Sequence, residues 1–571
     1  MSKLLLVCFR DRENNQINKI SPQFLEYLSS SIIPDNINPN KPSITKSPGL
    51  VLSILNPVLS CPCNELSAAL GVFLKPYGGW WKVKGPVPDG SFAIFRTNDD
   101  YVELLTDCTA SRTIWYIKTE SVFIASSSQR AILRVIGGFQ PNKQSHIWML
   151  SSGCIGPGFS WDKRIKQLEP DSILLFDRNR WEYSIQTHPI EFKNEMYDLE
   201  EGKKILRDEI TKVFDNIEFD ISRWVLPLSG GYDSRAILMF LKRKPFCVTW
   251  GKKNAIYEKQ NDAEVAKKVA AHFKVDHEYL FLDIDKHTIA EDIDRFIIAG
   301  EGRIDHIAGY VDGLKIWKQL FEKGFYGAIR GDKAFWPYKV NSEKHSRQMN
   351  GMLLYSDYEN LKRLIKKYEF SPIEREQEIP KHLLRRTDES LITWNDRIYH
   401  SFRYLYFYSA LNEVKGNYLE SFSPLVTRNL VYLMRLMNDE LRKEKKVYKE
   451  VVDELGPQIP YAKYNAIDTI SNIIRNEVIV NKLFINYKES KGKQCFPDKL
   501  LDEVLGYLDF DRVGLVAKKD IVVANFFNKI RYIFPNNQTA NNIGFYRLAF
   551  RIYIIIKMQE ILIDDSHKAI L

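Results

Sequence analysis

A glycine- and serine-rich segment, SGGYDSR (Ser229 to Arg235), stands between two apolar stretches of the chain. The preceding WVLPL is typical of a buried strand and the following AILMF of a helix. At such a turn, glycines expose backbone N–H groups, the helix N-terminus adds partial positive charge, and serine hydroxyls can donate to phosphate oxygens. The segment predicts a phosphate or pyrophosphate site made by Ser229, Gly230, Gly231, Asp233 and Ser234. Asp233 is also the expected ligand of a Mg²⁺ ion held against the phosphates.

Two other interpretations of this segment are weaker. It is not a Walker A loop, because the GxxxxGK[ST] spacing and its lysine are absent. A serine or aspartate cap after a glycine turn is common and explains part of the pattern. Such a cap does not require the complete SGGxDS sequence between a buried strand and an apolar helix, so nucleotide binding is the preferred interpretation.

Strands and helices are expected to alternate around the segment. After about residue 200, WVLPL, FCVTWG and HEYLFLD predict strands, and the stretch from Ser234 and AEVAKKVAAHF predict helices. This alternation favours a parallel sheet covered by helices, and the pattern beyond about Leu353 is mostly helical. Residues 1 to about 195 contain short aromatic and β-branched runs between turn residues, which predict antiparallel hairpins. The Asn- and Pro-rich piece from Pro34 to Gly49 is expected to be a loop.

The composition is that of a globular protein, with 44% hydrophobic residues, 27% charged residues and a net charge of +9. The basic clusters LKRK (Leu241 to Lys244) and RKEKK (Arg442 to Lys446) are interpreted as solvated helix faces rather than nucleic-acid sites. Seven cysteines give no paired framework, and the Cys61-Pro-Cys63 spacing fits neither a zinc ribbon nor a thioredoxin-type site. Reduced thiols and a cytoplasmic location are therefore expected.

No segment is expected to enter a membrane. The apolar run from Leu4 to Phe9 is too short for the core of a signal peptide and for a transmembrane helix. The late apolar stretch FYRLAFRIYIIIKMQEILI is interrupted by Arg547, Arg551 and Lys557, which predicts a buried amphipathic helix.

The SGGYDS segment resembles the pyrophosphate loop of the PP-loop ATPases, which cleave ATP to AMP and pyrophosphate. Over nearly its whole length, the chain resembles the asparagine synthetase family. FCVTWG and the later NDAEVAKKVAAHFKVDHEYL are similar to the family's second strand and to its stretch in which an aspartate precedes a helix and a histidine-led strand. Family members bind adenine and ribose at the end of that strand, which implies Val248, Thr249, Trp250 and Gly251 here.

Three later segments also resemble the family. RGDKAFWPY (Arg330 to Tyr338) looks like a degraded form of its glycine-rich GxGxDExFgGY signature; this implies Asp332 as a second ligand for Mg²⁺ and pyrophosphate, with Lys333 in place of the glutamate. GNYLESFSPLVTRNLVYLM is similar to the segment with the E-x-x-x-P-F-L-D core. KVYKEVVDELGPQIPYAKYN resembles the stretch leading to the essential lysine, which implies that Lys463 stabilises the oxyanion formed during attack on an acyl-adenylate.

The N-terminal part resembles the family's Ntn-type glutaminase domain, in DGSFAIFR, the Asp107 and Arg112 region, FIASSSQRAIL and LSSGCIGPGFSWDKRIKQLEPDSILLFD. Its chemistry is missing, because glutaminase members carry Cys-Gly-Ile after Met1 and this chain carries Ser2-Lys3-Leu4. Ser2 as a nucleophile is a weaker alternative, and Cys8 is expected to pack in a strand. The resemblance thus implies an α/β protein with a degenerate glutaminase-like antiparallel β-sandwich at 1–195. A PP-loop, parallel-sheet ligase domain with a helical C-terminal part is expected at 196–571.

Without glutamine-derived ammonia, the nitrogen must come from free ammonia or from an amine on the substrate. β-Lactam synthetases and the macrolactam cyclases of lasso peptides are similar in this respect. The resemblance implies an ATP- and Mg²⁺-dependent, AMP-forming carbon–nitrogen ligase with a specialised or macrolactam-forming substrate. Its expected partners are ATP, a carboxylate and amine substrate such as a precursor peptide, and pathway proteins, with neither nucleic acid nor membrane. No general base is assigned, because Ile329 stands where β-lactam members have a tyrosine.

Three alternatives stay open. Asparagine synthesis from aspartate and free ammonia needs the same adenylating site. A non-catalytic relic would explain the degraded second loop but not the retained SGGYDS and Lys463. A sulfur-transfer or tRNA-modifying PP-loop enzyme would need a persulfide cysteine, for which Cys495 is the candidate.

Overall fold

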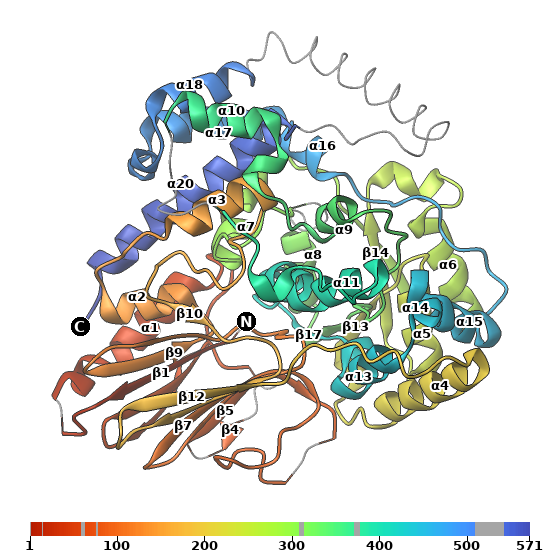
Figure 1. Cartoon of the computed structure of the whole chain (residues 1–571), viewed down its shortest axis with the longest axis horizontal. Coiled ribbons are helices and arrows are strands. Elements are labelled where there is room, and N and C mark those ends of the chain that lie inside the picture. Colours follow the sequence, from red (N-terminus) through yellow and green to blue (C-terminus); the bar gives the residue numbers. More distant parts are fainter. Residues whose placement is uncertain are drawn as a thin grey trace.

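The computed structural model describes residues 2–13, 15–58, 63–64, 66–75, 78–307, 313–369, 377–508 and 542–571. Within these ranges the chain forms two antiparallel sheets, a parallel sheet and a largely helical C-terminal part (Figure 1). The predicted α/β fold class is confirmed. Cys61 and the side chain of Cys63 lie outside the described residues.

The two antiparallel sheets come from the first 190 residues and share a core between their faces. Their strand orders are β10-β8-β9-β1-β3-β2 and β12-β11-β7-β6-β5-β4. The strands are β1 Lys3–Phe9, β2 Ser43–Ser47, β3 Leu50–Leu55, β4 Cys63–Asn64, β5 Ser67–Phe73, β6 Gly90–Thr97, β7 Tyr101–Thr106, β8 Trp115–Lys118, β9 Val122–Ser126, β10 Lys166–Gln167, β11 Ser172–Asp177 and β12 Glu182–Thr187.

Strand β1 is apolar along its length because both of its faces are buried. Leu4, Leu6 and Cys8 face the core between the two sheets. Leu5 and Val7 face a second core that includes helix α1 (Pro22–Ile32), since successive side chains of a strand point to opposite sides. The prediction that Cys8 packs in a strand is therefore confirmed.

One local prediction was wrong. The stretch from Pro34 to Gly49 was expected to be a loop, but Ser43–Ser47 forms β2, which pairs antiparallel with β3. β2 is an edge strand whose side chains are exposed or only partly buried. Its sequence, SITKS, therefore lacks the apolar alternation by which a strand is recognised.

The parallel sheet has the order β15-β14-β13-β16-β17. Its strands are β13 Trp224–Pro227, β14 Phe246–Gly251, β15 His277–Phe281, β16 Gly327–Ile329 and β17 Glu420–Phe422. Leu226 of the central strand faces a core formed with α4 (Leu199–Asp215), α5 (Tyr232–Phe240) and α6 (Asp262–Phe273). Val225 faces the opposite core, with α7 (Ile289–Ala299) and α8 (Gly313–Glu322). Helices thus cover both faces, as the alternating sequence pattern predicts.

Helices make up most of the chain after residue 340. The α-helices are α9 Glu343–Asn350, α10 Glu359–Lys367, α11 Leu391–Ile398, α12 Ser409–Lys415, α13 Arg428–Leu436, α14 Asp439–Arg442, α15 Lys446–Leu455, α16 Ile470–Ile474, α17 Glu477–Glu489, α18 Asp498–Gly506 and α20 Phe545–His567. A π-helix, η6 (Tyr399–Tyr408), continues α11 into α12. Short 3₁₀ turns are η1 Asn15–Lys19, η2 Ile221–Arg223, η3 Lys253–Tyr257, η4 Tyr355–Asp357, η5 Lys381–Leu383, η7 Pro424–Val426, η8 Lys443–Lys445 and η9 Lys491–Cys495.

The final helix, α20, packs the C-terminal end of the chain against the N-terminal part. It lies along α2 (Gln129–Ile136) and α3 (Lys143–Ser152) of the N-terminal part (Figure 1). Asp565 of α20 is fully buried and accepts hydrogen bonds from Arg130 and Arg134 of α2. This helix is the predicted buried amphipathic one, and the described helices include none that is long and apolar enough to cross a bilayer.

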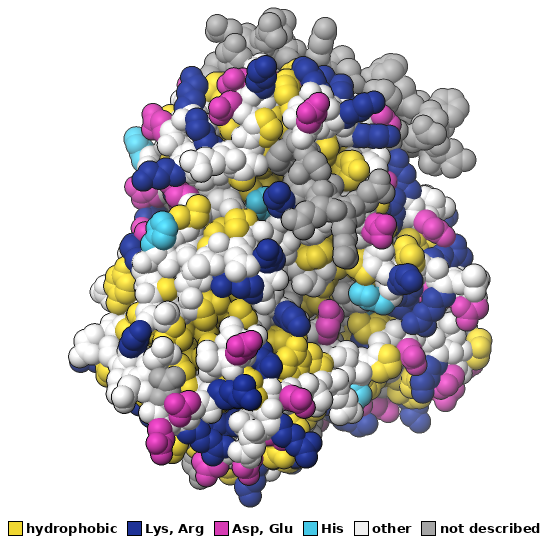
Figure 2. All heavy atoms as spheres, turned by 60° about the vertical axis from the view of Figure 1, so that its left-hand side comes forward, with side chains coloured by type: hydrophobic (Ala, Val, Ile, Leu, Met, Phe, Trp, Pro, Cys, Tyr) yellow, Lys and Arg dark blue, Asp and Glu magenta, His cyan; other side chains and the backbone are white. Residues whose placement is uncertain are grey.

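The face shown in Figure 2 has no single block of one charge. Lys and Arg side chains alternate with Asp and Glu side chains there, and hydrophobic side chains gather towards the middle of the view.

Candidate functional site

The SGGYDS segment joins the central strand β13 to α5, as predicted, and its serines hold the turn together. The Ser229 N–H donates to Ser234 Oγ at 3.0 Å, and the Gly231 N–H donates to Ser229 Oγ at 3.2 Å. Helix α5 begins at Tyr232, slightly earlier than predicted, and its N-cap Gly231 has no side-chain cap. The loop therefore holds its own shape at the carboxyl end of the sheet.

The two loop glycines have different surroundings. The Gly230 N–H donates to Asp262 Oδ1 at 2.9 Å, and a Cβ at Gly230 would lie 2.3 Å from the Ala462 Cβ. Gly230 is thus required for close packing of the 461–466 segment on the loop. A Cβ at Gly231 would meet only Ser229 Oγ, at 3.4 Å, so there is open space at the N-terminus of α5. This space suits the phosphates of ATP, which helix N-termini and backbone N–H groups stabilise.

Asp233, in the first turn of α5, lies between two lysines. Its carboxylate accepts from Lys333 at 2.8 Å and from Lys445 at 2.7 and 2.9 Å. Burial opposes the charge of Asp233, but the two ammonium groups outweigh burial and keep its pKa below the ordinary value. Burial lowers the pKa of Lys445 to about 7, against the attraction of Asp233 and with added repulsion from Lys333.

The segment after β16 presents Lys333 to this site. Gly331 packs on Asp233, since a Cβ there would be 3.1 Å from the Asp233 Cβ. The Lys333 carbonyl accepts hydrogen bonds from the hydroxyls of Tyr399, at 3.1 Å, and Tyr404. Both tyrosines lie on the π-helix η6, a type of helix that is frequent at functional sites. The segment that resembles a degraded glycine-rich loop is therefore held in place by hydrogen bonds to η6.

Asp332 faces away from Asp233, towards β17 and the residues after it. Its carboxylate accepts from Ser423 Oγ at 2.8 Å and lies 4.0 Å from Arg330. Burial opposes its charge, but Arg330 and Lys415 keep the pKa of Asp332 below the ordinary value.

The arrangement of Asp233 does not fit a Mg²⁺ ion. Both of its oxygens accept from ammonium groups, whereas a magnesium ligand needs an oxygen open to the ion. The described residues also contain no group of three or more His, Cys, Asp or Glu side chains suited to a metal. Mg²⁺ binding by Asp233 and Asp332 stays a prediction from the resemblance, and no step of the chemistry below depends on it.

The four residues predicted to bind adenosine lie at the carboxyl end of β14. Val248 is buried, and the Thr249 hydroxyl donates to the Leu228 carbonyl at 2.6 Å. Trp250 packs edge-on against Trp317 with ring centroids 5.0 Å apart. Gly251 lies against the 464–466 segment and the Tyr279 hydroxyl, where a Cβ would come within 2.6 Å of both. Their place next to the phosphate loop suits nucleotide binding, and their individual roles stay predictions.

Lys463 lies on the segment that packs against the loop, but its side chain is exposed. Its backbone N–H donates to the Gln260 carbonyl at 2.8 Å, and the preceding Ala462 N–H donates to the Gly230 carbonyl at 3.0 Å. The backbone is thus fixed beside the phosphate loop while the ammonium group can turn. A role for Lys463 at the oxyanion stays a prediction.

Sequence analysis missed Lys445. Its cluster RKEKK was interpreted as a solvated helix face, but Arg442 and Lys445 are buried, at 1% and 3% exposure. Arg442 pairs with Asp396 and Asp439. Glu444 and Lys445 adopt positive φ angles of 52° and 62°, which turn the lysine inwards. A run of charges gives no sign of such a turn, so nothing in the sequence could have identified Lys445.

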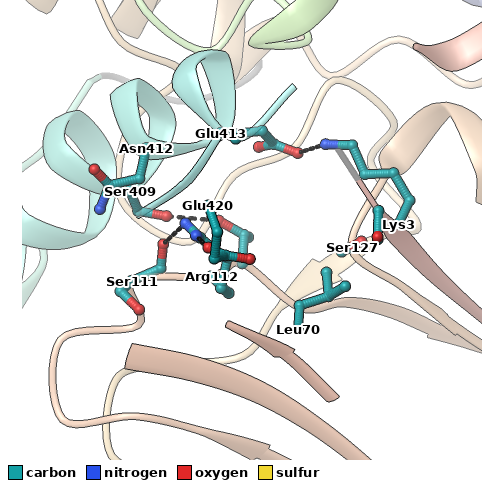
Figure 3. Close-up of a pocket in the computed structure, with 12 residues that line it drawn as sticks. Lys3, Leu70, Ser111, Arg112, Ser127, Ser409, Asn412, Glu413 and Glu420 are labelled. Carbon is teal, nitrogen blue, oxygen red and sulfur yellow. Dashed lines mark hydrogen bonds and ion pairs between the residues drawn. The ribbon is translucent and has the colours of Figure 1, made fainter. Parts of the chain in front are cut away.

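A small pocket lies where the N-terminal sheets meet α12 and β17, and charged pairs line it (Figure 3). Lys3 donates to Glu413 at 2.5 Å, Arg303 donates to Glu413 at 2.7 Å, and Arg112 pairs with Glu420. The remaining cavity is about 30 Å³. Such a volume holds about one water molecule and offers no space for glutamine.

The residue at position 2 has no catalytic arrangement. The Ser2 hydroxyl donates to the Asn56 carbonyl at 2.9 Å. Arg112, named with Asp107 in the resemblance to the glutaminase domain, pairs with Glu420, whereas Asp107 accepts hydrogen bonds from the backbone N–H groups of Phe92 and Thr109. These hydrogen bonds and ion pairs favour a structural role for the charges of this region, and the loss of glutaminase chemistry stays a prediction from the resemblance.

Cys495, the candidate persulfide cysteine, lies in η9 against α20 and donates its S–H to the Gly492 carbonyl at 3.2 Å. Burial raises the pKa of this thiol to about 12. A sulfur-transfer cysteine needs a thiolate near neutral pH, so this site does not favour that alternative.

A parallel sheet with a serine- and glycine-rich loop before a helix N-terminus is the arrangement in which many α/β domains bind phosphate groups. Residues 225–413 match the family model described as asparagine synthase. The match supports ATP-dependent amide ligation in general and favours no particular member of the family. No curated protein matches the chain.

Proposed function

We propose that this protein is an ATP-dependent ligase that activates a carboxylate as an acyl-adenylate and joins it to an amine. One observation carries the proposal: the Ser229–Ser234 loop lies at the carboxyl end of the central strand, with Lys333 and Lys445 facing the first turn of α5. This is the place where open parallel sheets bind their ligands, and its positive charge suits a polyphosphate.

The proposed reaction has two steps. A carboxylate oxygen of the substrate attacks the α-phosphorus of ATP, the bond to the β-phosphate oxygen breaks, and pyrophosphate leaves. An amine nitrogen then attacks the activated carbonyl carbon, AMP leaves with the electrons of the C–O bond, and the amine proton passes to solvent. Lys463 would stabilise the oxyanion of the second step, for which its exposed, flexible side chain must turn towards the loop.

The closed N-terminal site supports an amine source other than glutamine. Charged pairs fill the place where ammonia would be released, and only about 30 Å³ stays empty. An amine on the substrate itself is the favoured nucleophile, because holding both groups in one molecule supplies much of the rate. Free ammonia, and hence asparagine synthesis from aspartate, is the second candidate.

A cavity of about 310 Å³ next to the phosphate site is the proposed place for the acyl substrate. Trp336 and Tyr338, which follow Lys333, form one wall, and Lys443 and Glu444, which precede Lys445, form another. Trp336 is buried at 5% exposure, so its ring is a fixed part of the cavity lining. The cavity is larger than aspartate needs, which favours a specialised or macrolactam-forming substrate. Such a substrate could be a precursor peptide, delivered by pathway proteins in the cytoplasm.

Product analysis tests the proposal. The purified chain is incubated with ATP, in Mg²⁺ and separately in EDTA, together with aspartate and ammonia, aspartate and glutamine, or a small-peptide extract. We expect AMP and pyrophosphate with the peptide extract, and their loss in Asp233→Ala and Lys463→Ala. Turnover with aspartate and ammonia alone would establish asparagine synthesis instead. If no substrate yields AMP, the chain is a non-catalytic relative.

A further inference from the structure

From the resemblance, a glutamate is expected at position 333 and a divalent cation at Asp233. The structure instead has the ammonium groups of Lys333 and Lys445 against Asp233. Lys445 contacts both oxygens of Asp233, and Lys333 contacts one of them. The exposed fractions of the three side chains are 16% for Asp233, 24% for Lys333 and 4% for Lys445. Lys445 is thus buried, whereas Asp233 and Lys333 are partly exposed to solvent.

Both lysines are held in place by the fold. The Lys333 backbone is anchored by two tyrosine hydroxyls of η6. Lys445 sits at a left-handed backbone position between η8 and α15, with its ammonium group 5.5 Å from the centre of the Tyr448 ring. The buried Lys445 side chain is therefore pre-organised beside Asp233, and the anchored backbone of Lys333 places its side chain within reach of the same carboxylate.

The charges of the site do not cancel. Two lysines, Lys333 and Lys445, face the single carboxylate of Asp233. Buried cations in excess of carboxylates are costly unless an anion compensates them. The opening at Gly231, next to Asp233, is where such an anion can approach the first turn of α5.

We propose that Lys333 and Lys445 replace a protein-bound divalent cation at Asp233, so that the site binds the β- and γ-phosphates of a nucleotide without a metal ligand from the chain. The inference rests on the proposed function, because it assumes that the loop binds ATP. Asp233 then acts as a positioning residue, which holds the two ammonium groups towards the phosphates.

Calorimetric titration of the full chain with ATP tests the idea. We expect wild-type affinity in EDTA to be within about threefold of the affinity in Mg²⁺. Lys333→Glu restores an acidic residue beside Asp233, so ATP affinity in EDTA should fall roughly 10- to 100-fold and recover when Mg²⁺ is added. Lys333→Gln should lose EDTA affinity without such recovery. Lys482→Glu is the control, because Lys482 is equally exposed, at 24%, and pairs with Asp294 at the same 2.8 Å.

A tenfold or greater requirement of the wild type for Mg²⁺ would overturn the replacement. So would Mn²⁺ bound at the wild-type site, detected by electron paramagnetic resonance and lost in Asp233→Asn, or absence of ATP binding in both conditions. Circular dichroism and thermal melting verify that each variant is folded. ATP binding in EDTA combined with no AMP formation would retain the metal-free phosphate site and reject only the ligase.

Discussion

Two clusters of charged side chains, one at the Ser229–Ser234 loop and one where the N-terminal sheets meet α12, differ in how their charges are balanced. At the phosphate loop, Lys333 and Lys445 share the single carboxylate of Asp233 beside open space. Where the N-terminal sheets meet α12 and β17, charged pairs such as Arg112 with Glu420 fill the interface, and the cavity is only about 30 Å³.

This difference in charge balance indicates which of the two clusters could bind a ligand. Charges that satisfy one another in a closed space contribute to the packing of two parts of the chain. Charges left in excess beside an opening require a ligand. The N-terminal cluster thus has the geometry of a structural contact, whereas the Ser229–Ser234 loop lies beside open space.

The largest expected effect tests the structural half of this comparison. The Glu413 side chain is 8% exposed and pairs with both Lys3 and Arg303, so Glu413→Ala removes the carboxylate that these two buried cations share. We expect the free energy of unfolding to fall by about 3–5 kcal/mol. Urea denaturation followed by circular dichroism measures it. The folded fraction should bind ATP with unchanged affinity.

A control identifies burial as the cause. Lys482→Ala breaks the more exposed pair with Asp294 and should lower the free energy of unfolding by less than about 1 kcal/mol. Equal losses in the two variants would show that the N-terminal cluster contributes no more than a surface pair, and the comparison would fail.

The two loop glycines provide a sharper test within the phosphate site. Gly230→Ala places a methyl group 2.3 Å from Ala462, and we expect a stability loss of about 1–3 kcal/mol together with weaker ATP binding. Gly231→Ala meets open space, so stability should change by no more than about 0.5 kcal/mol while ATP affinity falls. Thermal melting and calorimetry distinguish the two. Unchanged ATP affinity in Gly231→Ala would place the phosphates elsewhere.

Protonation of Lys445 gives a third test. Burial lowers the pKa of Lys445 to about 7, so in the ligand-free protein the group is largely neutral at pH 8. A bound polyphosphate favours the charged form and raises that pKa, so ATP binding at pH 8 should take up close to one proton. Calorimetry in buffers of different ionisation enthalpy counts it. Lys445→Arg, which is always charged, should bind ATP without proton uptake.

The same lowered pKa has a consequence for stability. Between about pH 7 and the ordinary lysine value, the unfolded chain holds a proton at this position that the folded chain lacks. The contribution of Lys445 to the free energy of unfolding therefore increases as pH rises through this range, and it is least favourable below pH 7. An opposite slope, relative to Lys445→Arg, would contradict the assignment.

The sequence was sufficient for features carried by local pattern. The alternation of apolar segments predicts the parallel sheet and both of its covering layers, and SGGYDS marks the turn between β13 and α5. The sequence was insufficient where contacts between distant residues determine the local structure. Ser43–Ser47 becomes a strand because β3 offers an edge, and Lys445 enters the site because two residues take left-handed backbone angles. The pairing of Lys333 with Asp233 joins positions 100 residues apart, which no local spacing reports.

The smallest expected effect concerns a cysteine outside both clusters. Cys495 packs against α20, donates to the Gly492 carbonyl, and has a pKa raised to about 12 by burial. Because a neutral buried thiol is a poor nucleophile, Cys495→Ser should leave AMP formation within about twofold of the wild type. Loss of turnover in Cys495→Ser, together with a persulfide detected by mass spectrometry in the wild type, would move the chemistry from the phosphate loop and its amine acceptor to sulfur transfer. An unchanged rate would leave Lys333, Lys445 and the Ser229–Ser234 loop as the residues on which ATP chemistry depends.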